Sequence, residues 1–163
     1  MTEPADAAPH QELPRIPASA GAMIFDGAGR LLILKPTYKE GWTIPGGQVE
    51  EGGESPWEAC RRETFEECGL WVGRSRLACV DFLHASPDRA GGVRFLFDCG
   101  VLSDEHLGEI KIDGGEIEEF RLLPLKDARA LLSGPLRRRV KASAEQRRCV
   151  YLEDGRRVKG VRR

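Results

Sequence analysis

One short segment, residues 46–70, constrains this chain more than any other, because it joins a glycine pair, a capped helix start and a cluster of acids. Glu63, Glu66 and Glu67 stand three and four residues apart, and such positions share one face of an α-helix. Three carboxylates on one face repel one another unless a cation lies between them. A divalent cation with oxygen ligands suits this arrangement, and magnesium often shares its coordination with phosphate. The segment therefore predicts a metal site that acts on a phosphorylated substrate.

The helix that carries these acids has clear start and stop signals. Ser55 is a typical N-cap, Pro56 suits the first helical position, and Glu58 completes a capping box. Gly69 is expected to end the helix in a left-handed conformation. The glycine pair Gly46–Gly47 precedes the helix and has no side chains, so its backbone can approach a ligand closely. This context favours a functional site over the alternative, a solvated acidic helix face with ion pairs.

The same segment, called the box below, resembles the signature of the Nudix hydrolases. In that signature a Gly, five residues, a Glu and seven residues precede Arg-Glu-hydrophobic-any-Glu-Glu-any-Gly-hydrophobic. Here Glu54 is followed, after seven residues, by a run from Arg62 to Leu70 that fits the second half. There are two departures: six residues separate Gly47 from Glu54, and Thr64 stands where an aliphatic residue is usual. The charged half of the signature is therefore intact.

The resemblance implies an α+β fold, the Nudix αβα sandwich around a central mixed β-sheet, and it extends loosely over residues 18–132. It also implies a bound Mg2+ or Mn2+. Arg62 keeps its charge and is expected to hold a neighbouring carboxylate, with Glu54 as the partner, rather than to contact substrate. The expected metal ligands are the carbonyl of Gly46 and the carboxylates of Glu63, Glu66 and Glu67.

A further glutamate outside the box is also implied by the resemblance. MutT-type members place one six residues before a hydrophobic strand position, and Glu116 stands six before Leu122. Glu116 is therefore the predicted general base, with Glu119 and Glu118 as substitutes, and an exposed loop acid is the alternative interpretation. The expected catalytic residues are Arg62, Glu63, Glu66, Glu67 and Glu116.

Two aromatic residues are the candidate substrate-binding residues, because rings stack on nucleobases. Trp42 lies just before the glycine pair and Tyr38 lies in a polar loop. Phe95 and Phe97 alternate with other residues in a predicted strand, which favours core packing for both. The expected substrate is thus a small phosphorylated molecule, most readily a nucleotide.

The predicted reaction is metal-dependent hydrolysis of a phosphoanhydride bond, in a nucleoside diphosphate linked to another moiety or in a nucleoside triphosphate. Two alternatives stay open: a nucleotide-sensing module of the same fold without turnover, and a hydrolase of a non-nucleotide diphosphate. All box acids and Arg62 are present, which favours the enzyme.

The order of elements predicts one mixed sheet between helices. Residues 1–17 are expected to be a flexible leader, 18–135 the Nudix domain, and 136–163 a basic extension packed on it. Strands are predicted over 22–25, 30–34, 77–83, 93–101 and 116–123, a helix over 125–132, and a hairpin from 149–152 and 156–159.

Charge and cysteine content limit the expected partners and cellular location of the protein. The net charge of −1 argues against a general nucleic-acid or membrane binder, although residues 136–163 carry eleven Lys/Arg against three acids. An RNA 5′ end is the one nucleic-acid partner that this basic segment allows, and a homodimer is compatible with it. The five cysteines lack metal-binding spacing, and no stretch is apolar enough to span a bilayer. A cytoplasmic location is expected.

Overall fold

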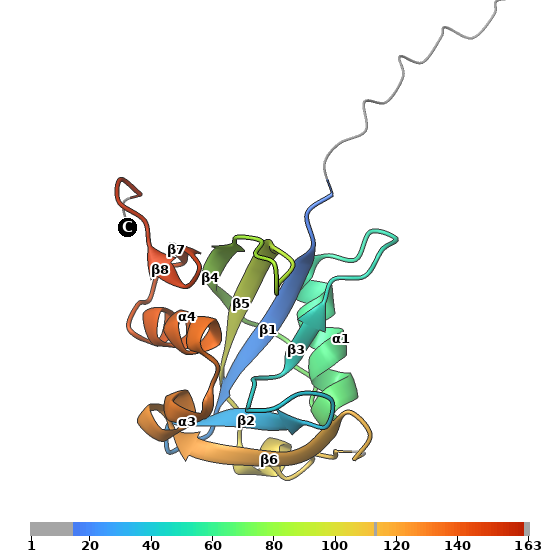
Figure 1. Ribbon diagram of the computed structural model, residues 1–163. Coiled ribbons are helices and arrows are strands. Elements are labelled where there is room, and N and C mark those ends of the chain that lie inside the picture. The colour runs from blue at the N-terminus through green and yellow to red at the C-terminus, as the bar shows by residue number, and fades with distance from the viewer. Residues whose placement is uncertain (1–14, 113, 162–163) are drawn as a thin grey trace, which may run out of the picture.

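The computed structural model of the chain describes residues 15–112 and 114–161. Its strands are β1 (Ala18–Phe25), β2 (Arg30–Pro36), β3 (Gly46–Gln48), β4 (Arg76–Leu83), β5 (Gly92–Val101), β6 (Ile117–Pro124), β7 (Val150–Glu153) and β8 (Arg156–Arg157). Its helices are α1 (Pro56–Cys68), α2 (Asp104–Leu107), α3 (Leu125–Leu131) and α4 (Gly134–Ala144). The strands form one mixed sheet in the order β6-β2-β1-β5-β4-β7-β8, and β3 pairs with β1 (Figure 1).

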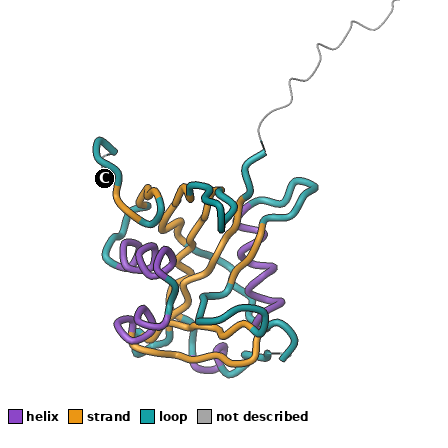
Figure 2. The backbone as a smooth tube through the Cα atoms, viewed as in Figure 1, coloured by secondary structure: helices purple, strands orange, loops and turns teal. Residues whose placement is uncertain are grey.

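Helices cover both faces of this sheet. α1 lies on one side, and α3 and α4 lie on the other (Figures 1 and 2). The apolar run in β2 explains why both faces need cover: Leu32 and Leu34 pack in the core on the α1 side, while Leu31 and Ile33 pack on the opposite side. A strand that is apolar at every position is stable only when it is buried on both faces. The predicted α+β sandwich around a mixed sheet is thus confirmed.

The box helix α1 has the predicted ends. The Ser55 hydroxyl accepts a hydrogen bond from the Glu58 amide at 3.3 Å, and the Ser55 amide donates to the Glu58 carboxylate at 2.8 Å. At the other end, Gly69 adopts φ 72° and its amide donates to the Phe65 carbonyl at 2.8 Å. These bonds satisfy backbone groups that a helix leaves open at its termini. They fix where α1 starts and therefore how its acids are aimed.

The extra residue before Glu54 is absorbed in an exposed turn. Gly52 and Gly53 have φ angles of 96° and 97°, which only glycine adopts without strain. Beyond the turn, Glu54 accepts a hydrogen bond from the Glu50 amide at 2.7 Å and contacts Arg62. The insertion therefore changes the loop and leaves the acidic helix in place.

The strands predicted from the sequence are confirmed, as are the helix near residue 125 and the terminal hairpin. β1 begins four residues earlier than predicted, at Ala18. The sequence interpretation did not include β3, α2 or α4. Most of the expected leader, residues 1–14, lies outside the described residues, while the carbonyl of Pro17 accepts a hydrogen bond from the Val93 amide at 2.9 Å. Within the described residues, none of the helices has the length and apolarity needed to cross a membrane.

Candidate active site

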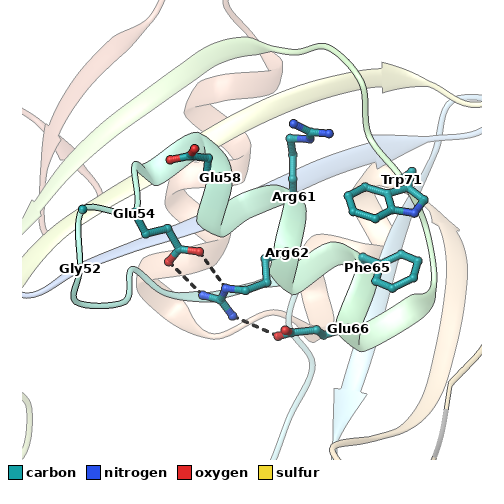
Figure 3. Close-up of a pocket in the computed structure, with 9 residues that line it drawn as sticks. Gly52, Glu54, Glu58, Arg61, Arg62, Phe65, Glu66 and Trp71 are labelled. Carbon is teal, nitrogen blue, oxygen red and sulfur yellow. Dashed lines mark hydrogen bonds and ion pairs between the residues drawn. The ribbon is translucent and has the colours of Figure 1, made fainter.

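Arg62 is the centre of the charge network on α1. Its Nε and Nη2 bind the two oxygens of Glu54 at 2.8 and 3.1 Å, which is the predicted partnership. Its Nη1 donates to one oxygen of Glu63 at 2.8 Å and to one oxygen of Glu66 at 3.0 Å, and Nη2 also reaches the Gln48 carbonyl at 3.0 Å. Figure 3 shows the guanidinium between Glu54 and Glu66. Arg62 therefore orients two of the box acids.

Glu67 lies deeper than the other acids and away from Arg62. Only 5% of the residue is exposed, and one carboxylate oxygen accepts a hydrogen bond from the Gly46 amide at 2.7 Å. Burial raises the pKa of Glu67 to about 7, and the nearby charge of Glu63 adds to this rise, while the Gly46 amide opposes it. Burial also raises the pKa of Glu63, against the effect of Arg62. Glu67 thus lies one helical turn from Glu63 and forms no ion pair within the described residues, whereas Glu63 is paired with Arg62.

The glycine pair serves the packing of these acids. A Cβ atom on Gly46 would stand under 3.0 Å from the backbone of Ala20 and Gly21 in β1, and Gly46 adopts φ 146°. A Cβ on Gly47 would overlap the Glu63 carboxylate. The sequence suggested close approach of backbone to a ligand. The structure shows close approach of β3 to β1 and to the box acids, and this approach explains why both residues are glycine.

The donor set fits a divalent cation. Arg62 donates to one oxygen of Glu63 and to one of Glu66, and the Gly46 amide donates to one oxygen of Glu67. Within the described residues, the second oxygen of each of these carboxylates accepts no hydrogen bond. No three acidic, imidazole or thiol groups in the described part of the chain already surround a single point. The buried Glu67 carboxylate, whose pKa burial raises, is the group that a cation would stabilise most. The oxygens are the hard ligands that Mg2+ prefers, so the residues suit the ion.

Glu116 immediately precedes β6, a strand at the edge of the sheet, and its charge acts on the box acids. It is exposed just before β6, and its carbonyl accepts a hydrogen bond from the Thr37 amide at 2.9 Å. Its negative charge contributes to the raised pKa values of Glu63, Glu67 and Tyr38, which places its carboxylate near the box acids. Within the described residues, its carboxylate forms no ion pair.

The two substitutes for Glu116 are engaged elsewhere. Glu118 forms an ion pair with Lys35, and Glu119 accepts a hydrogen bond from Arg121 at 2.6 Å. Both pairs run along the exposed part of β6 and β2. Of the three acids considered from the sequence, Glu116 is thus the one with a carboxylate available near the box.

A cleft of about 520 Å3, called the central cleft below, borders the glycine pair. Tyr38 and Trp42 both line it, together with Gly46 and Gly47. Tyr38 is 64% exposed and lies at the rim. Trp42 is half-buried, and the guanidinium of Arg121 stacks on its ring with 4.6 Å to the ring centre. The structure therefore brings both predicted aromatic residues to one cleft, although one face of the Trp42 ring is already covered.

Three cations of the central cleft were not predicted as site residues: Lys39, Arg94 and Arg139. Lys39 and Arg94 are isolated basic residues in the sequence, and basic residues of this kind usually lie on the surface. Arg139 lies on α4, which the sequence interpretation missed. The pattern of Ser133, a proline in the first turn and the apolar Leu136 and Val140 four positions apart was the available signal for that helix.

A second cleft of about 590 Å3 lies on the outer side of α1 (Figure 3). Phe65 and Trp71 stack there with ring centres 4.5 Å apart, and the guanidinium of Arg61 lies 5.6 Å from the Trp71 ring centre. Glu54, Arg62 and Glu66 form its polar wall. This cleft borders the box but contains neither glycine of the pair and neither predicted aromatic residue.

The buried position of Glu67 predicts a pH dependence of stability in the absence of divalent metal. Its folded-state pKa is about 7 and its ordinary value is 4.5, so between these pH values the folded chain binds more protons than the unfolded chain. The free energy of unfolding should therefore fall as pH rises from about 5 to 7.5, by about 2.5 kcal/mol from this group. Urea unfolding in EDTA across this range measures it.

The matched control is Glu67→Gln, which cannot ionise. The difference in unfolding free energy between the original chain and this variant isolates Glu67 from other titrating groups. A difference that stays constant from pH 5 to 7.5 would contradict the assignment of a buried, uncompensated carboxyl.

Comparison with known proteins agrees with this geometry. A NUDIX domain family model matches residues 15–143. A search of curated proteins gives no match. The MutT NUDIX hydrolase from Burkholderia pseudomallei is 25% identical, with 82% of this chain and 99% of that chain covered and a TM-score of 0.63.

Two further solved structures share the fold at lower identity. A C. elegans Ap4A hydrolase, in a binary complex, is 22% identical, with 80% and 96% of the two chains covered and a TM-score of 0.62. The NUDIX domain of Shewanella oneidensis NrtR, complexed with ADP ribose, is 16% identical, with 86% and 94% covered and a TM-score of 0.67. The family match spans most of the chain and includes the whole box, so the chain belongs to the Nudix family and is a Nudix pyrophosphohydrolase.

Proposed function

We propose that this pyrophosphohydrolase cleaves a phosphoanhydride bond in a nucleoside diphosphate linked to another moiety, or in a nucleoside triphosphate, with Mg2+ or Mn2+ as cofactor. The observation that carries the proposal is the buried Glu67 carboxylate, which lies one turn from Glu63 and is bonded to the Gly46 amide at the edge of the central cleft. Carboxylates held together in this way gain most from a divalent cation, and such ions neutralise phosphate oxygens.

The box residues have distinct roles in this proposal. Glu63, Glu66 and Glu67 would hold the ion, together with the Gly46 carbonyl. When bound, the ion supplies charge neutralisation for the phosphate oxygens. Arg62 does not contact substrate; it holds Glu63 and Glu66 in place through Nη1, and Glu54 fixes the guanidinium from the other side. The protein thus contributes positioning and electrostatics, which dominate phosphoryl chemistry.

Glu116 is the proposed general base. In the reaction, a water oxygen bonds to one phosphorus, the bond from that phosphorus to the bridging oxygen breaks, and the water gives up a proton. The Glu116 carboxylate can accept that proton, because it is near the box acids and forms no ion pair within the described residues. Tyr38 and Trp42 would contact the nucleoside from the rim and wall of the central cleft.

The variant Glu116→Gln tests this role. It keeps the side-chain size and removes the basic oxygen, so we expect kcat to fall by about 10²-fold with a small change in KM. Steady-state kinetics on the best substrate measure both constants. Glu119→Gln, three residues later in β6 and paired with Arg121, is the matched control and should retain kcat. An unchanged kcat in Glu116→Gln would place the base elsewhere.

The substrate class is tested with a panel of nucleoside triphosphates, nucleotide sugars, ADP-ribose, dinucleoside polyphosphates, triphosphorylated RNA ends and non-nucleotide diphosphates. Each is incubated with Mg2+ or Mn2+, and both products are identified by mass. Hydrolysis in 18O-labelled water shows which phosphorus is attacked. The proposal predicts turnover of at least one nucleotide that depends on the added metal. Tight nucleotide binding without turnover would instead support the sensing module, and turnover of non-nucleotide diphosphates alone would also contradict the proposal.

A further inference from the structure

A row of paired residues crosses the sheet from β3, which contains the glycine pair, toward the strands that α4 covers. Ser19 in β1 pairs with Gln48 in β3 on one side and with Arg94 in β5 on the other, and Arg94 pairs with Asp81 in β4. Side chains of directly paired residues on adjacent strands share one face of a sheet. The contact from Arg139 of α4 to Asp81, at 3.0 Å, identifies this as the α4 face. Arg94, Asp81 and Arg139 therefore meet under α4.

The charges in this cluster do not balance. The buried Asp81 carboxylate accepts a hydrogen bond from the Gly155 amide at 2.9 Å and forms its ion pair with Arg139. Arg94 forms no ion pair within the described residues, and its one hydrogen bond there, to the carbonyl of Val93, is long at 3.4 Å. One carboxylate thus faces two guanidinium groups, each of which keeps its charge in a protein.

A second nearby acid does not correct this imbalance. Asp154 forms an ion pair with Arg89 at 2.9 Å, and its carboxylate lies 2.9 Å from His84 Nδ1. Its charge is therefore already engaged. Burial lowers the pKa of both Arg94 and Arg139, as expected for cations held away from water with incomplete compensation.

Arg94 and Arg139 both line the central cleft, whereas Asp81 does not. The Asp81 side chain has no exposed surface. Of the residues that line the cleft, Glu40 alone is acidic. A ligand in the cleft thus meets the positive side of the cluster, where charge-assisted hydrogen bonds are strongest because water is partly excluded.

We propose that Arg94 and Arg139 form an anion-binding subsite in the central cleft, and that the substrate carries a second negatively charged group, a phosphate or a carboxylate, beyond the diphosphate that is cleaved. Arg94 lies two strands from Gln48, which follows the glycine pair, so about 10 Å separates these backbone positions. This spacing allows a nucleoside to lie between the two anionic groups. The inference rests on the proposed function for the position of the scissile diphosphate.

Direct binding of inorganic pyrophosphate, measured calorimetrically in EDTA at low salt, tests the subsite without a metal at the box. The original chain should bind the probe, and Arg94→Gln should bind it at least tenfold more weakly. Arg94→Lys, which keeps the charge, should fall between them. Arg147→Gln removes an exposed arginine outside the cleft and is the matched control. Failure of the original chain to bind, or equal binding by Arg94→Gln, would overturn the subsite.

Asp81→Asn separates ligand binding from a purely structural role. It removes the charge that engages Arg139 and keeps the side-chain size, so pyrophosphate affinity should rise several-fold. If the cluster served only to attach α4 to the sheet, affinity would stay the same or fall with stability. Thermal unfolding of each variant shows whether it is folded, and the Arg94 variants test the proposal even if Asp81→Asn does not fold.

A matched pair of nucleotides then tests specificity. ADP-ribose and ADP-ribose with a 2′-phosphate on its adenosine differ by one anionic group, and both contain a diphosphate. The original chain should bind the phosphorylated compound more tightly in a calcium buffer, and Arg94→Gln should remove this preference. An equal preference in the two proteins would overturn the specificity role. Absence of hydrolysis of every nucleotide would refute the proposed function, while the pyrophosphate measurement in EDTA would still decide on the subsite.

Discussion

Replacement of Glu67 by Gln is expected to lower kcat/KM by on the order of 10³-fold while the fold stays intact. The variant keeps the side-chain volume and an oxygen that can accept the hydrogen bond from the Gly46 amide. It removes the negative charge that a divalent ion would need. Because burial raises the pKa of this carboxyl to about 7, loss of the charge should also leave the metal-free protein as stable as before, or more stable, above pH 7. Kinetics over a range of Mg2+ concentrations, with urea unfolding alongside, measure both effects.

Two comparisons make this result specific. Glu145→Gln removes an exposed acid at the C-terminal end of α4 and should retain full activity, so it controls for a general change of net charge. Metal binding by Glu67→Gln should be weaker than in the original chain when followed calorimetrically with Mn2+. Near-normal turnover with Mg2+ in the variant would show that the box is not the metal site, whatever the stability data show.

The box was predictable from the sequence because its signals are local. Ser55, Glu58 and Gly69 fix the ends of α1 through bonds that span three or four residues, and the spacing of the acids then follows from the helical repeat. The pairing of Arg62 with Glu54 was also expected, because the extra residue lies before Glu54 and leaves the spacing between the two unchanged. Glu54 lies just before the capped start of α1 and Arg62 lies about two turns into it, so Glu54 has few other oppositely charged partners within reach.

The central cleft was only partly predictable, because its walls come from distant parts of the chain. Tyr38 and Trp42 were identified by type and by their distance from the glycine pair. Arg139 was not, since its role depends on α4 packing across β4 and on an ion pair with Asp81, 58 positions earlier in the chain. The charge pattern of residues 136–163 suggested only a basic extension. The structure shows that one of those arginines, Arg139, is buried against the sheet, forms an ion pair with Asp81 and lines the central cleft.

The close approach of β3 to β1 predicts a large cost for a side chain at Gly46. Gly46→Ala should lower the free energy of unfolding by about 3 kcal/mol or more. Its Cβ would overlap the backbone of Ala20 and Gly21, and backbone atoms cannot rotate away as a flexible side chain can. The φ angle of 146° adds strain for any residue with a Cβ. Denaturant unfolding measures the change, and activity should fall with it because the amide that holds Glu67 shifts.

Gly27→Ala is the matched control for this substitution. Gly27 lies in the turn between β1 and β2, has no positive φ, and would place its Cβ with nothing within 4 Å. Its unfolding free energy should change by about 0.5 kcal/mol or less, as is usual for an unconstrained surface position. If the two variants unfolded at the same denaturant concentration, the tight contact of β3 with β1 would be wrong. The explanation of the glycine pair by packing against β1 and the box acids would then fail, and a requirement for ligand approach at the cleft would be the remaining physical reason for glycine there.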